Sequence, residues 1–252
     1  MSTALFATLT SFAIVIEIIF VPLFLKAQRP GICVKSFCFK MICANMFLLL
    51  GVLSWKYSGN SSEFAKFMLI GLGLSWMGDL FLHLKLSEKS KTLTFAIGFC
   101  FFTAAHVLYL VAFSKAWKQY FPEKSYFSPI DVGLFLTVFI CAFIFVKFIK
   151  KLPLKGIGIP VSTGYGIFLV SMFVKAVTFS INYIIDMGTA AIPGAICLSI
   201  GALCFLMSDA SLALLMFNPG DKGRIGLKNH NIGTYFMAQT LLALSILFIG
   251  II

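Results

Sequence analysis

Eight apolar stretches, each close to the length of a bilayer-spanning helix, divide this chain of 252 residues. A helix needs about 20 apolar residues, with a range of roughly 17–25, to cross the hydrocarbon core of a membrane. The sequence therefore predicts an all-α, multi-pass membrane protein with eight transmembrane helices. No connection is long enough for a soluble domain, so we expect one membrane domain over residues 1–252. The predicted helices are 4–25, 37–54, 64–84, 93–113, 130–149, 160–181, 191–217 and 232–252.

Composition excludes several classes of function. Of the residues, 60% are hydrophobic and 12% are charged, against about a quarter charged in soluble domains. The net charge of +11 comes from short basic clusters between apolar runs, which favours contact with anionic lipid and not with nucleic acid. The seven cysteines include no CxxC pair, and no histidines stand at zinc-binding spacing. We expect no metal, no cofactor and no disulfide framework.

The distribution of lysine and arginine predicts the orientation in the membrane. The first, third, fifth and seventh connections carry thirteen basic residues, and the second, fourth and sixth, with their borders, carry five. Basic residues concentrate on the cytoplasmic side, so the odd-numbered connections should be cytoplasmic. Asn60 begins an Asn-Ser-Ser sequon on a predicted lumenal connection. We expect an integral protein of the endoplasmic reticulum or another internal membrane.

Five charged residues lie inside predicted spans, where a charge at the bilayer centre costs at least about 2.5–3.5 kcal/mol. They are Glu17, Lys40, Asp79, Lys175 and Asp209. Such a residue indicates a functional site by default. A structural alternative stays open, because a buried acid can pair with a buried base only to hold two helices together. Lys175 lies toward the predicted lumenal end, where its side chain could reach the interface.

The predicted topology places several polar side chains at one depth. Asp79 lies late in a helix that runs toward the cytoplasm, and so does Asp209. Lys40, Tyr235 and Gln239 lie early in helices that leave the cytoplasmic side. Five polar groups from four helices at a similar level favour a single cavity.

Spacing within the helices indicates which side chains share a face. Residues three or four apart are neighbours on a helix, and small residues allow another helix to approach closely. The pairs on one face are Asp79 with His83, His106 with Tyr109, and Tyr235 with Gln239, and the small residues Gly194, Gly201 and Ser208 recur every seven positions.

These residues occur in segments that resemble the YhhN family of eight-helix membrane proteins. The resemblance extends over most of the chain, in the right order, and rests on GD, HxxY, SD and TYxxAQ elements that are jointly specific. The segments are FCFKMICANMFLLL (37–50), WMGDLFLH (76–83), GFCFFTAAHVLYLVAF (98–113), GYGIFLVSMFVKAV (164–177), GALCFLMSDASLALLMF (201–217) and GTYFMAQTLLALS (233–245).

The resemblance implies the activity of the family's characterised animal members, which are lysoplasmalogenases. They hydrolyse the vinyl ether of a lysoplasmalogen to a fatty aldehyde and a glycerophospho-choline or -ethanolamine, so the implied partners are this lipid and water. The aspartate pair falls on Asp79 and Asp209. His106 and Tyr109 carry the HxxY element, and Tyr235 and Gln239 carry the last-helix element. Lys40 matches a helix-two lysine, but Ile42 stands where family members often have proline.

The chemistry of vinyl-ether hydrolysis fits two buried carboxyl groups. Protonation of the β-carbon by a neutral carboxylic acid gives an oxocarbenium ion, which water captures. A second, ionised carboxylate stabilises the cation or activates the water, as it does in glycosidases. The sequence leaves open which of Asp79 and Asp209 is the acid. Lys40 is a candidate contact for the substrate phosphate, and His83 a supporting residue.

Other classes of function remain as alternatives. A proton-coupled transporter of lipids or small molecules would also place acids on facing helices, although no inverted repeat is visible. An intramembrane aspartyl protease fits poorly, because Trp76 occupies the position where a GxGD motif requires glycine. No GxSxG or HExxH motif occurs. A receptor or a purely structural protein leaves Asp79 and Asp209 without a role.

Overall fold

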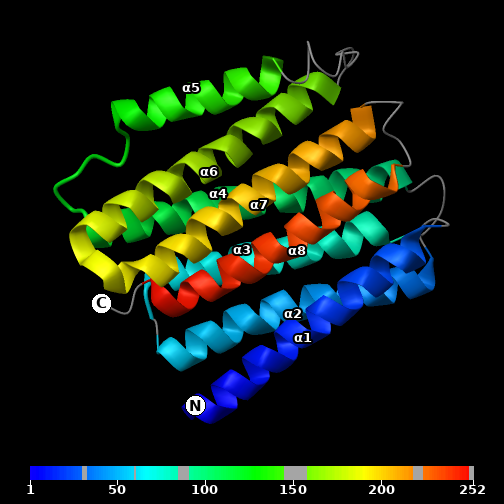
Figure 1. Ribbon diagram of the computed structural model, residues 1–252. Helices are drawn as coiled ribbons and strands as arrows, with labels where there is room; N and C mark the ends of the chain where they lie inside the picture. The colour runs from blue at the N-terminus through cyan, green and yellow to red at the C-terminus, as the bar shows by residue number, and fades with distance from the viewer. Residues whose placement is uncertain (30–32, 60, 85–90, 145–157, 218–223, 250–252) are drawn as a thin grey trace.

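The computed structural model describes residues 1–29, 33–59, 61–84, 91–144, 158–217 and 224–249, and these ranges form α-helices and one short 3-10 turn without any strand (Figure 1). The prediction of an all-α protein is confirmed. The elements are α1 (Thr3–Gln28), α2 (Val34–Ser58), α3 (Glu63–His83), α4 (Lys91–Tyr120), α5 (Pro129–Ile144), α6 (Gly158–Met187), η2 (Gly188–Ala191), α7 (Ile192–Phe217) and α8 (Ile225–Phe248).

Local sequence signals set several helix ends. The hydroxyl of Ser2 accepts a hydrogen bond from Leu5 N at 3.3 Å, and Ser62 accepts one from Ala65 N at 3.2 Å. Each serine thereby satisfies one of the free N–H groups in the first turn of α1 or α3. At the end of α2, Gly59 adopts φ 64°, a left-handed conformation that glycine tolerates best.

Some helices are longer than the apolar runs that predicted them. The α4 helix continues to Tyr120, α6 continues to Met187, and α8 begins at Ile225. The added turns contain lysine, asparagine and aspartate, which an apolar run excludes but an α-helix accommodates. The predicted span 130–149 extends past Ile144 into residues outside the described ranges.

Most of the helices are long and apolar enough to cross a membrane, which identifies an integral membrane protein. The continuous stretch Gly164–Met216 contains both α6 and α7, joined through η2, and α5 is shorter than a full span. The qualifying stretches are Thr3–Gln28, Val34–Ser58, Glu63–His83, Leu93–Tyr120, Gly164–Met216 and Ile225–Phe248.

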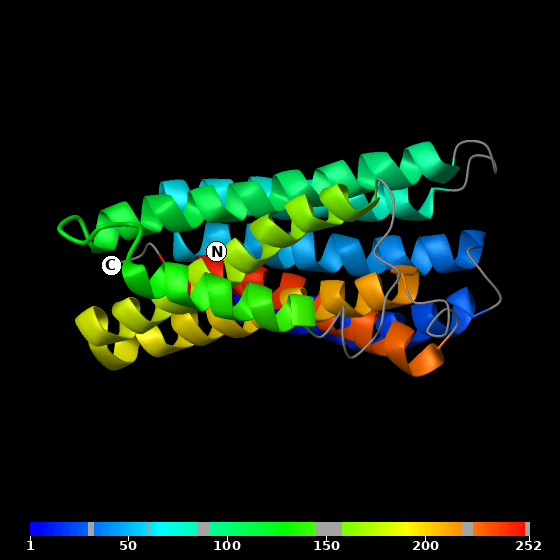
Figure 2. The same cartoon turned by 90° about the horizontal axis from the view of Figure 1, so that it is seen from above.

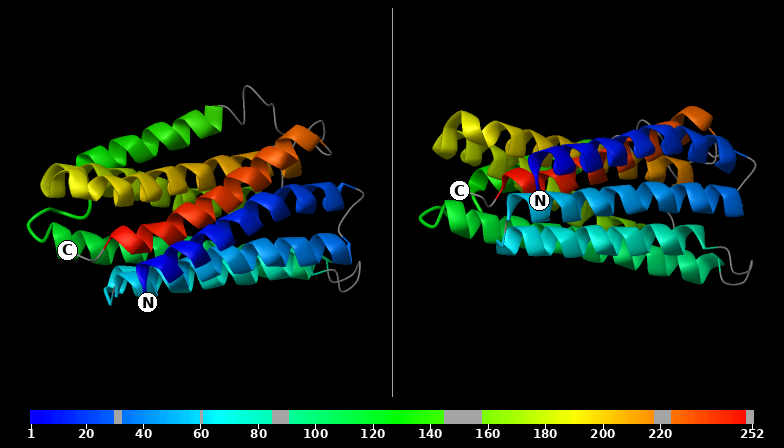
Figure 3. Two further views of the ribbon diagram at one scale, coloured as in Figure 1. Left: turned by 60° about the horizontal axis from the view of Figure 1, so that its bottom comes forward. Right: turned by 90° about the horizontal axis from the view of Figure 1, so that it is seen from below.

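The helices pack side by side as an antiparallel bundle (Figures 1 and 2). The N-terminus and the end of α8 lie at one end of the bundle, and α1, α3, α5 and α7 finish at the opposite end, where the next helix begins. In the bundle α2 contacts α1, α3 and α8, whereas α5 lies at the edge and packs against α6. Seen from below, α1 crosses in front of α8 (Figure 3), with which it is in contact.

Glycines bring α3 close to α4. A Cβ atom on Gly71 would lie 2.5 Å from the Tyr109 ring, and one on Gly78 would lie 2.6 Å from the Phe102 ring. Both distances are too short for real atoms, so the aromatic rings of α4 occupy the space left by the missing side chains. These two contacts fix the position of α4 at the level of the candidate site.

The small-residue face predicted on α7 packs against α8. A Cβ atom added to Gly201 would lie 3.2 Å from Leu241 and from Leu242, and one added to Gly194 would contact Phe248. On the same face, Ser208 receives a hydrogen bond from Asn231 at 3.0 Å. The neighbour that approaches this face is therefore α8.

Candidate active site

Asp79 lies in the bundle interior, where α2, α3 and α8 meet. Its Oδ1 atom is 2.7 Å from Lys40 Nζ, and its Oδ2 atom accepts a hydrogen bond from the Tyr235 hydroxyl at 2.6 Å. The Asp79 and Lys40 side chains are 1% and 4% exposed. Because the ammonium group stabilises the charged form of a carboxyl at this distance, the pair favours an ionised Asp79.

His83 is the second partner of Lys40. Its Nδ1 atom lies 3.0 Å from Lys40 Nζ, and its Nε2 atom lies 3.4 Å from the Gln28 amide. A lysine ammonium can only donate, so Nδ1 accepts the hydrogen bond from Lys40. Lys40 thus points to Asp79 and His83 in the interior.

A second cluster of polar side chains, formed by Ser75, Tyr109 and Gln239, connects α3, α4 and α8. The Tyr109 hydroxyl donates to Gln239 Oε1 at 3.2 Å and lies 3.2 Å from the Ser75 hydroxyl. All three side chains are fully buried. The Gln239 Nε2 donor has no hydrogen-bond partner in the described part of the chain.

Asp209 has a different environment from Asp79. Its Oδ2 atom accepts a short hydrogen bond from the Tyr165 hydroxyl of α6. Within the described ranges no lysine, arginine or histidine forms an ion pair with Asp209. In the part of the chain that the structure describes, the carboxyl therefore has a hydroxyl donor but no compensating positive charge.

Aromatic rings connect the two aspartate–tyrosine pairs through His106. The His106 ring lies 5.2 Å from the Tyr165 ring and 4.6 Å from the Phe205 ring, between centroids. The Phe205 ring in turn lies 5.7 Å from the Tyr235 ring. His106 consequently lies between Tyr165, which binds Asp209, and Phe205. The Phe205 ring in turn packs on Tyr235, which binds Asp79.

The predicted site residues come together in part. Lys40, Asp79, His83 and Tyr235 are connected by direct polar contacts, and Tyr109 pairs with Gln239. Among the described residues, no hydrogen bond or ion pair joins Asp79 to Asp209. The aspartates form two separate Asp–Tyr pairs and not one carboxyl dyad.

Sequence reasoning did not select Tyr165. It is a hydroxyl-bearing aromatic in an apolar run, within the segment GYGIFLVSMFVKAV that carries the family resemblance. That position alone does not reveal which acid it binds. Its partner follows from the packing of α6 against α7, which a pattern within a single helix cannot show.

The other buried charges lie apart from this network. Glu17 Oε2 accepts a hydrogen bond from Thr240 at 2.5 Å, on the side of α8 that faces α1. Lys175 Nζ lies 3.1 Å from Asp131 Oδ2 and contacts the Tyr126 carbonyl. The Lys175 side chain is 4% exposed, so it forms a buried ion pair with Asp131.

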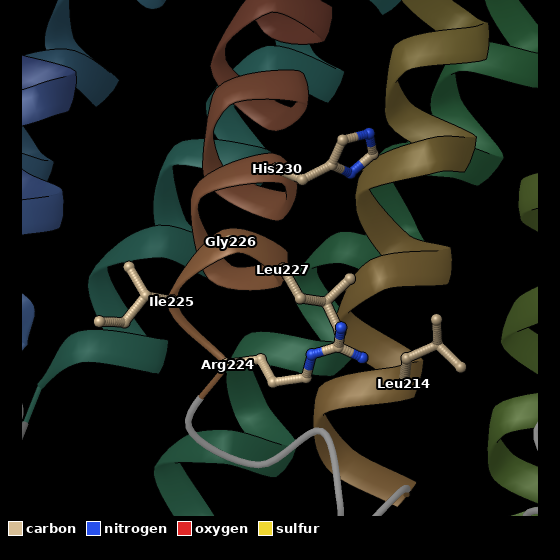
Figure 4. Close-up of a pocket in the computed structure, with 6 residues that line it drawn as sticks. All are labelled: Leu214, Arg224, Ile225, Gly226, Leu227 and His230. Atoms are coloured by element: carbon tan, nitrogen blue, oxygen red, sulfur yellow. The ribbon is translucent and has the colours of Figure 1, made fainter.

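The structure contains a cavity of about 520 Å³ where α7 ends and α8 begins. Figure 4 shows Arg224, Leu227 and His230 directed from α8 toward α7, where Leu214 lies. His230 Nδ1 lies 2.8 Å from the Ser211 hydroxyl. A second groove of about 360 Å³ separates α1 from α8 and has Glu17 and Thr240 in its lining.

Metal-binding geometry is missing from the described residues, which contain no cluster of three or more histidine, cysteine, aspartate or glutamate side chains suited to an ion. All seven cysteines are free.

Comparison with protein families gives a match to the YhhN family model over residues 35–246. The chain belongs to the YhhN family. Searches of the curated proteins and of the solved structures found no match. The YhhN match begins just before Lys40 and ends after Gln239, so it contains every predicted site residue but not Glu17 of α1.

Proposed function

We propose that this YhhN-family protein is a lysoplasmalogenase, which hydrolyses a vinyl ether to a fatty aldehyde and a glycerophospho-choline or -ethanolamine. Family membership makes this activity compatible with the chain. The observation that carries the proposal is the contrast between its two interior aspartates. Asp79 contacts an ammonium group, whereas Asp209 contacts a tyrosine hydroxyl. The proposed mechanism of vinyl-ether hydrolysis uses one carboxyl group of each kind.

In this proposal Asp209 is the acid. A carboxyl group within a membrane and without a cationic partner is held in its neutral form, because burial disfavours the charge. The neutral group donates its proton to the β-carbon of the vinyl ether, and the double-bond electrons form the new C–H bond. Tyr165 orients the carboxyl and stabilises the carboxylate that the transfer produces.

Asp79 is the anion in this mechanism. Protonation of the β-carbon leaves a positive charge on the α-carbon and the ether oxygen. A carboxylate about 4 Å from that charge stabilises it by about 4 kcal/mol at an effective dielectric constant of about 20. Lys40 and Tyr235 hold Asp79 ionised and in place before the reaction begins.

The cavity at the start of α8 is the proposed site of the substrate headgroup. Arg224 lines this cavity, and a guanidinium can bind a phosphate through two parallel hydrogen bonds. At 1.5 Å per residue, Arg224 and His230 precede Tyr235 by about 16 and about 7 Å along the axis of α8. The headgroup would then lie nearer the end of the bundle than the vinyl ether does.

The membrane arrangement belongs to the same proposal. We propose eight crossings with cytoplasmic odd-numbered connections, in the endoplasmic reticulum or another internal membrane. The described part of α5, Pro129–Ile144, spans about 24 Å at 1.5 Å per residue, somewhat less than the hydrocarbon core of about 30 Å. The antiparallel arrangement agrees with a crossing by α5, since α6 packs against it and runs in the opposite direction.

The test is an assay of purified protein with three lysolipids that differ only in the linkage of the chain. These are the vinyl ether, the ester and the saturated alkyl ether. The proposal expects aldehyde release from the vinyl ether and no hydrolysis of the alkyl ether, which cannot form an oxocarbenium ion by protonation at carbon. Hydrolysis of the ester alone overturns the chemistry. Proton-coupled lipid movement in vesicles, with all three lipids left intact, favours the transporter instead.

A further inference from the structure

The two ring nitrogens of His106 have unequal surroundings. Nδ1 lies 2.7 Å from the carbonyl oxygen of Phe102, one turn earlier on α4. A carbonyl can only accept, so Nδ1 carries the proton and Nε2 of the neutral imidazole carries a lone pair. The side chain is completely buried. Nε2 has no hydrogen-bond partner among the described residues.

An unpaired acceptor in a membrane interior is unfavourable, because no solvent is present to satisfy it. The Phe102 carbonyl fixes the tautomer, so the imidazole cannot relieve Nε2 by moving its proton. Since the described residues supply no donor to Nε2, the O–H or N–H group of a bound molecule can satisfy it. Water is the donor that a hydrolase must bring to this place.

The position of His106 relates it to both aspartates. Its ring packs on Tyr165, which donates to Asp209. It also packs on Phe205, whose ring contacts Tyr235 of the other pair. His106 therefore packs directly on the tyrosine partner of Asp209 and is connected to the Asp79 pair through the Phe205 ring.

We propose that His106 Nε2 accepts a hydrogen bond from the attacking water and takes its proton. This inference rests on the proposed function. After Asp209 protonates the β-carbon, the water oxygen bonds to the α-carbon of the oxocarbenium ion while one water proton moves to Nε2. The products of this step are a hemiacetal and a His106 imidazolium, with Asp209 as carboxylate.

Collapse of the hemiacetal returns each group to its starting state. The His106 imidazolium donates its Nε2 proton to the departing glycerol oxygen as the C–O bond breaks. The hemiacetal hydroxyl gives its proton to the Asp209 carboxylate as the aldehyde C=O forms. The net reaction consumes one water molecule, and neither His106 nor Asp209 is altered.

The first test is His106→Asn. The asparagine amide can still donate toward the Phe102 carbonyl, but it lacks the basic Nε2 atom. We expect a kcat lower by about 10²–10⁴-fold, the usual contribution of a general base, with KM within about 3-fold of wild type. Cys100→Ser, on the lipid-exposed side of the same helix, is the matched control and should retain wild-type kcat.

A second readout separates water capture from protonation. In D₂O, an oxocarbenium ion that is not captured loses a β-proton and returns to the vinyl ether with deuterium at that carbon. Mass spectrometry of the unreacted lysoplasmalogen should show this exchange with His106→Asn and little of it with wild type. Asp209→Asn should show neither hydrolysis nor exchange, because it cannot protonate the carbon.

The outcomes distinguish the inference from the function on which it rests. Wild-type protein that does not cleave the vinyl ether overturns the function. A folded His106→Asn protein with near-normal kcat, or one that loses exchange together with hydrolysis, overturns only the role of His106. If this variant does not fold, nitrogen-15 histidine spectra of the wild type decide the matter. With three histidines in the chain, a His106 resonance with a protonated Nε2 in the resting protein contradicts the proposal.

Discussion

Lys40 Nζ lies 2.7 Å from Oδ1 of Asp79, and both side chains are almost entirely buried. Two charges in a membrane interior are favourable only as a pair, because removal of one leaves the other uncompensated. In the proposed mechanism this pair makes Asp79 the ionised carboxyl, and it thereby separates the functions of Asp79 and Asp209.

The Lys40–Asp79 pair predicts an asymmetric result for substitutions. Lys40→Met should destabilise the fold by about 3–5 kcal/mol, because Asp79 is left buried and unpaired. The double variant Lys40→Met with Asp79→Asn should recover most of this stability while remaining inactive. Thermal unfolding in detergent and aldehyde release measure the two effects. A Lys40→Met protein of normal stability whose only defect is a raised KM for phosphate-bearing substrates would instead indicate contact with the headgroup.

Substitution of the aspartates tests the division of labour between them. Asp209→Asn and Asp79→Asn should each reduce turnover by about 10²–10⁴-fold, the range of acid–base catalysis. Since the two groups act in one reaction, the double variant should be little slower than either single variant. Aldehyde release and unfolding temperature should be measured together. A well-folded single variant with near-normal release contradicts the aspartate mechanism.

The glycines of α3 provide a matched test of site geometry. Gly78→Ala places a methyl group against Phe102, the residue whose carbonyl orients His106. Overpacking of this kind typically costs about 1–3 kcal/mol, and displacement of α4 should lower kcat as well. Gly73→Ala is the control, because an added Cβ has nothing within 4 Å. Equal kcat values for the two variants would show that the close approach of α3 and α4 does not position the site.

The sequence predicted the helical fold because a membrane admits few backbone structures, and an apolar run of this length indicates a helix. It also selected Lys40, Asp79 and Tyr235, since charged and hydroxyl groups are conspicuous in such runs. Their mutual contacts agree with the expectation of a shared level. The partner of an acid was less predictable.

Contacts between helices explain what the sequence could not give. Tyr165 binds Asp209 because α6 packs beside α7, and patterns within one helix contain no information about its rotation against a neighbour. The ion pair of Lys175 with Asp131, at the start of α5, likewise depends on the packing of α5 against α6. The sequon at Asn60 lies outside the described residues.

The Lys175–Asp131 pair should affect stability without affecting catalysis. Lys175 lies 4.4 Å from the Trp117 ring and 4.1 Å from the Tyr126 ring, measured to the centroids, so it connects α4, α5 and α6. Asp131→Asn should lower the unfolding temperature, because the ammonium group loses its buried counter-charge. The protein that remains folded should keep a wild-type kcat. A kcat reduced more than about 10-fold at unchanged stability would place this ion pair in the reaction instead.

The last prediction concerns orientation, for which Cys33 is a natural reporter. This cysteine is exposed and precedes α2, at the end of the bundle that holds the odd-numbered connections. A hydrogen bond from the Ser36 backbone N–H lowers the pKa of the Cys33 thiol, which increases the reactive thiolate at neutral pH. Above this lowered pKa, an impermeant maleimide should label Cys33 in sealed vesicles whose cytoplasmic face is outward. Labelling should slow as the pH falls and the thiolate is protonated.

A cysteine introduced as Glu123→Cys, between α4 and α5, should react only after the vesicles are opened with detergent. The two positions should be compared in the background Cys38→Ser, Cys100→Ser and Cys141→Ser, which removes the other exposed thiols. Protection of Cys33 together with free labelling at position 123 would invert the proposed topology, and the headgroup cavity beside Arg224 would then face the lumen.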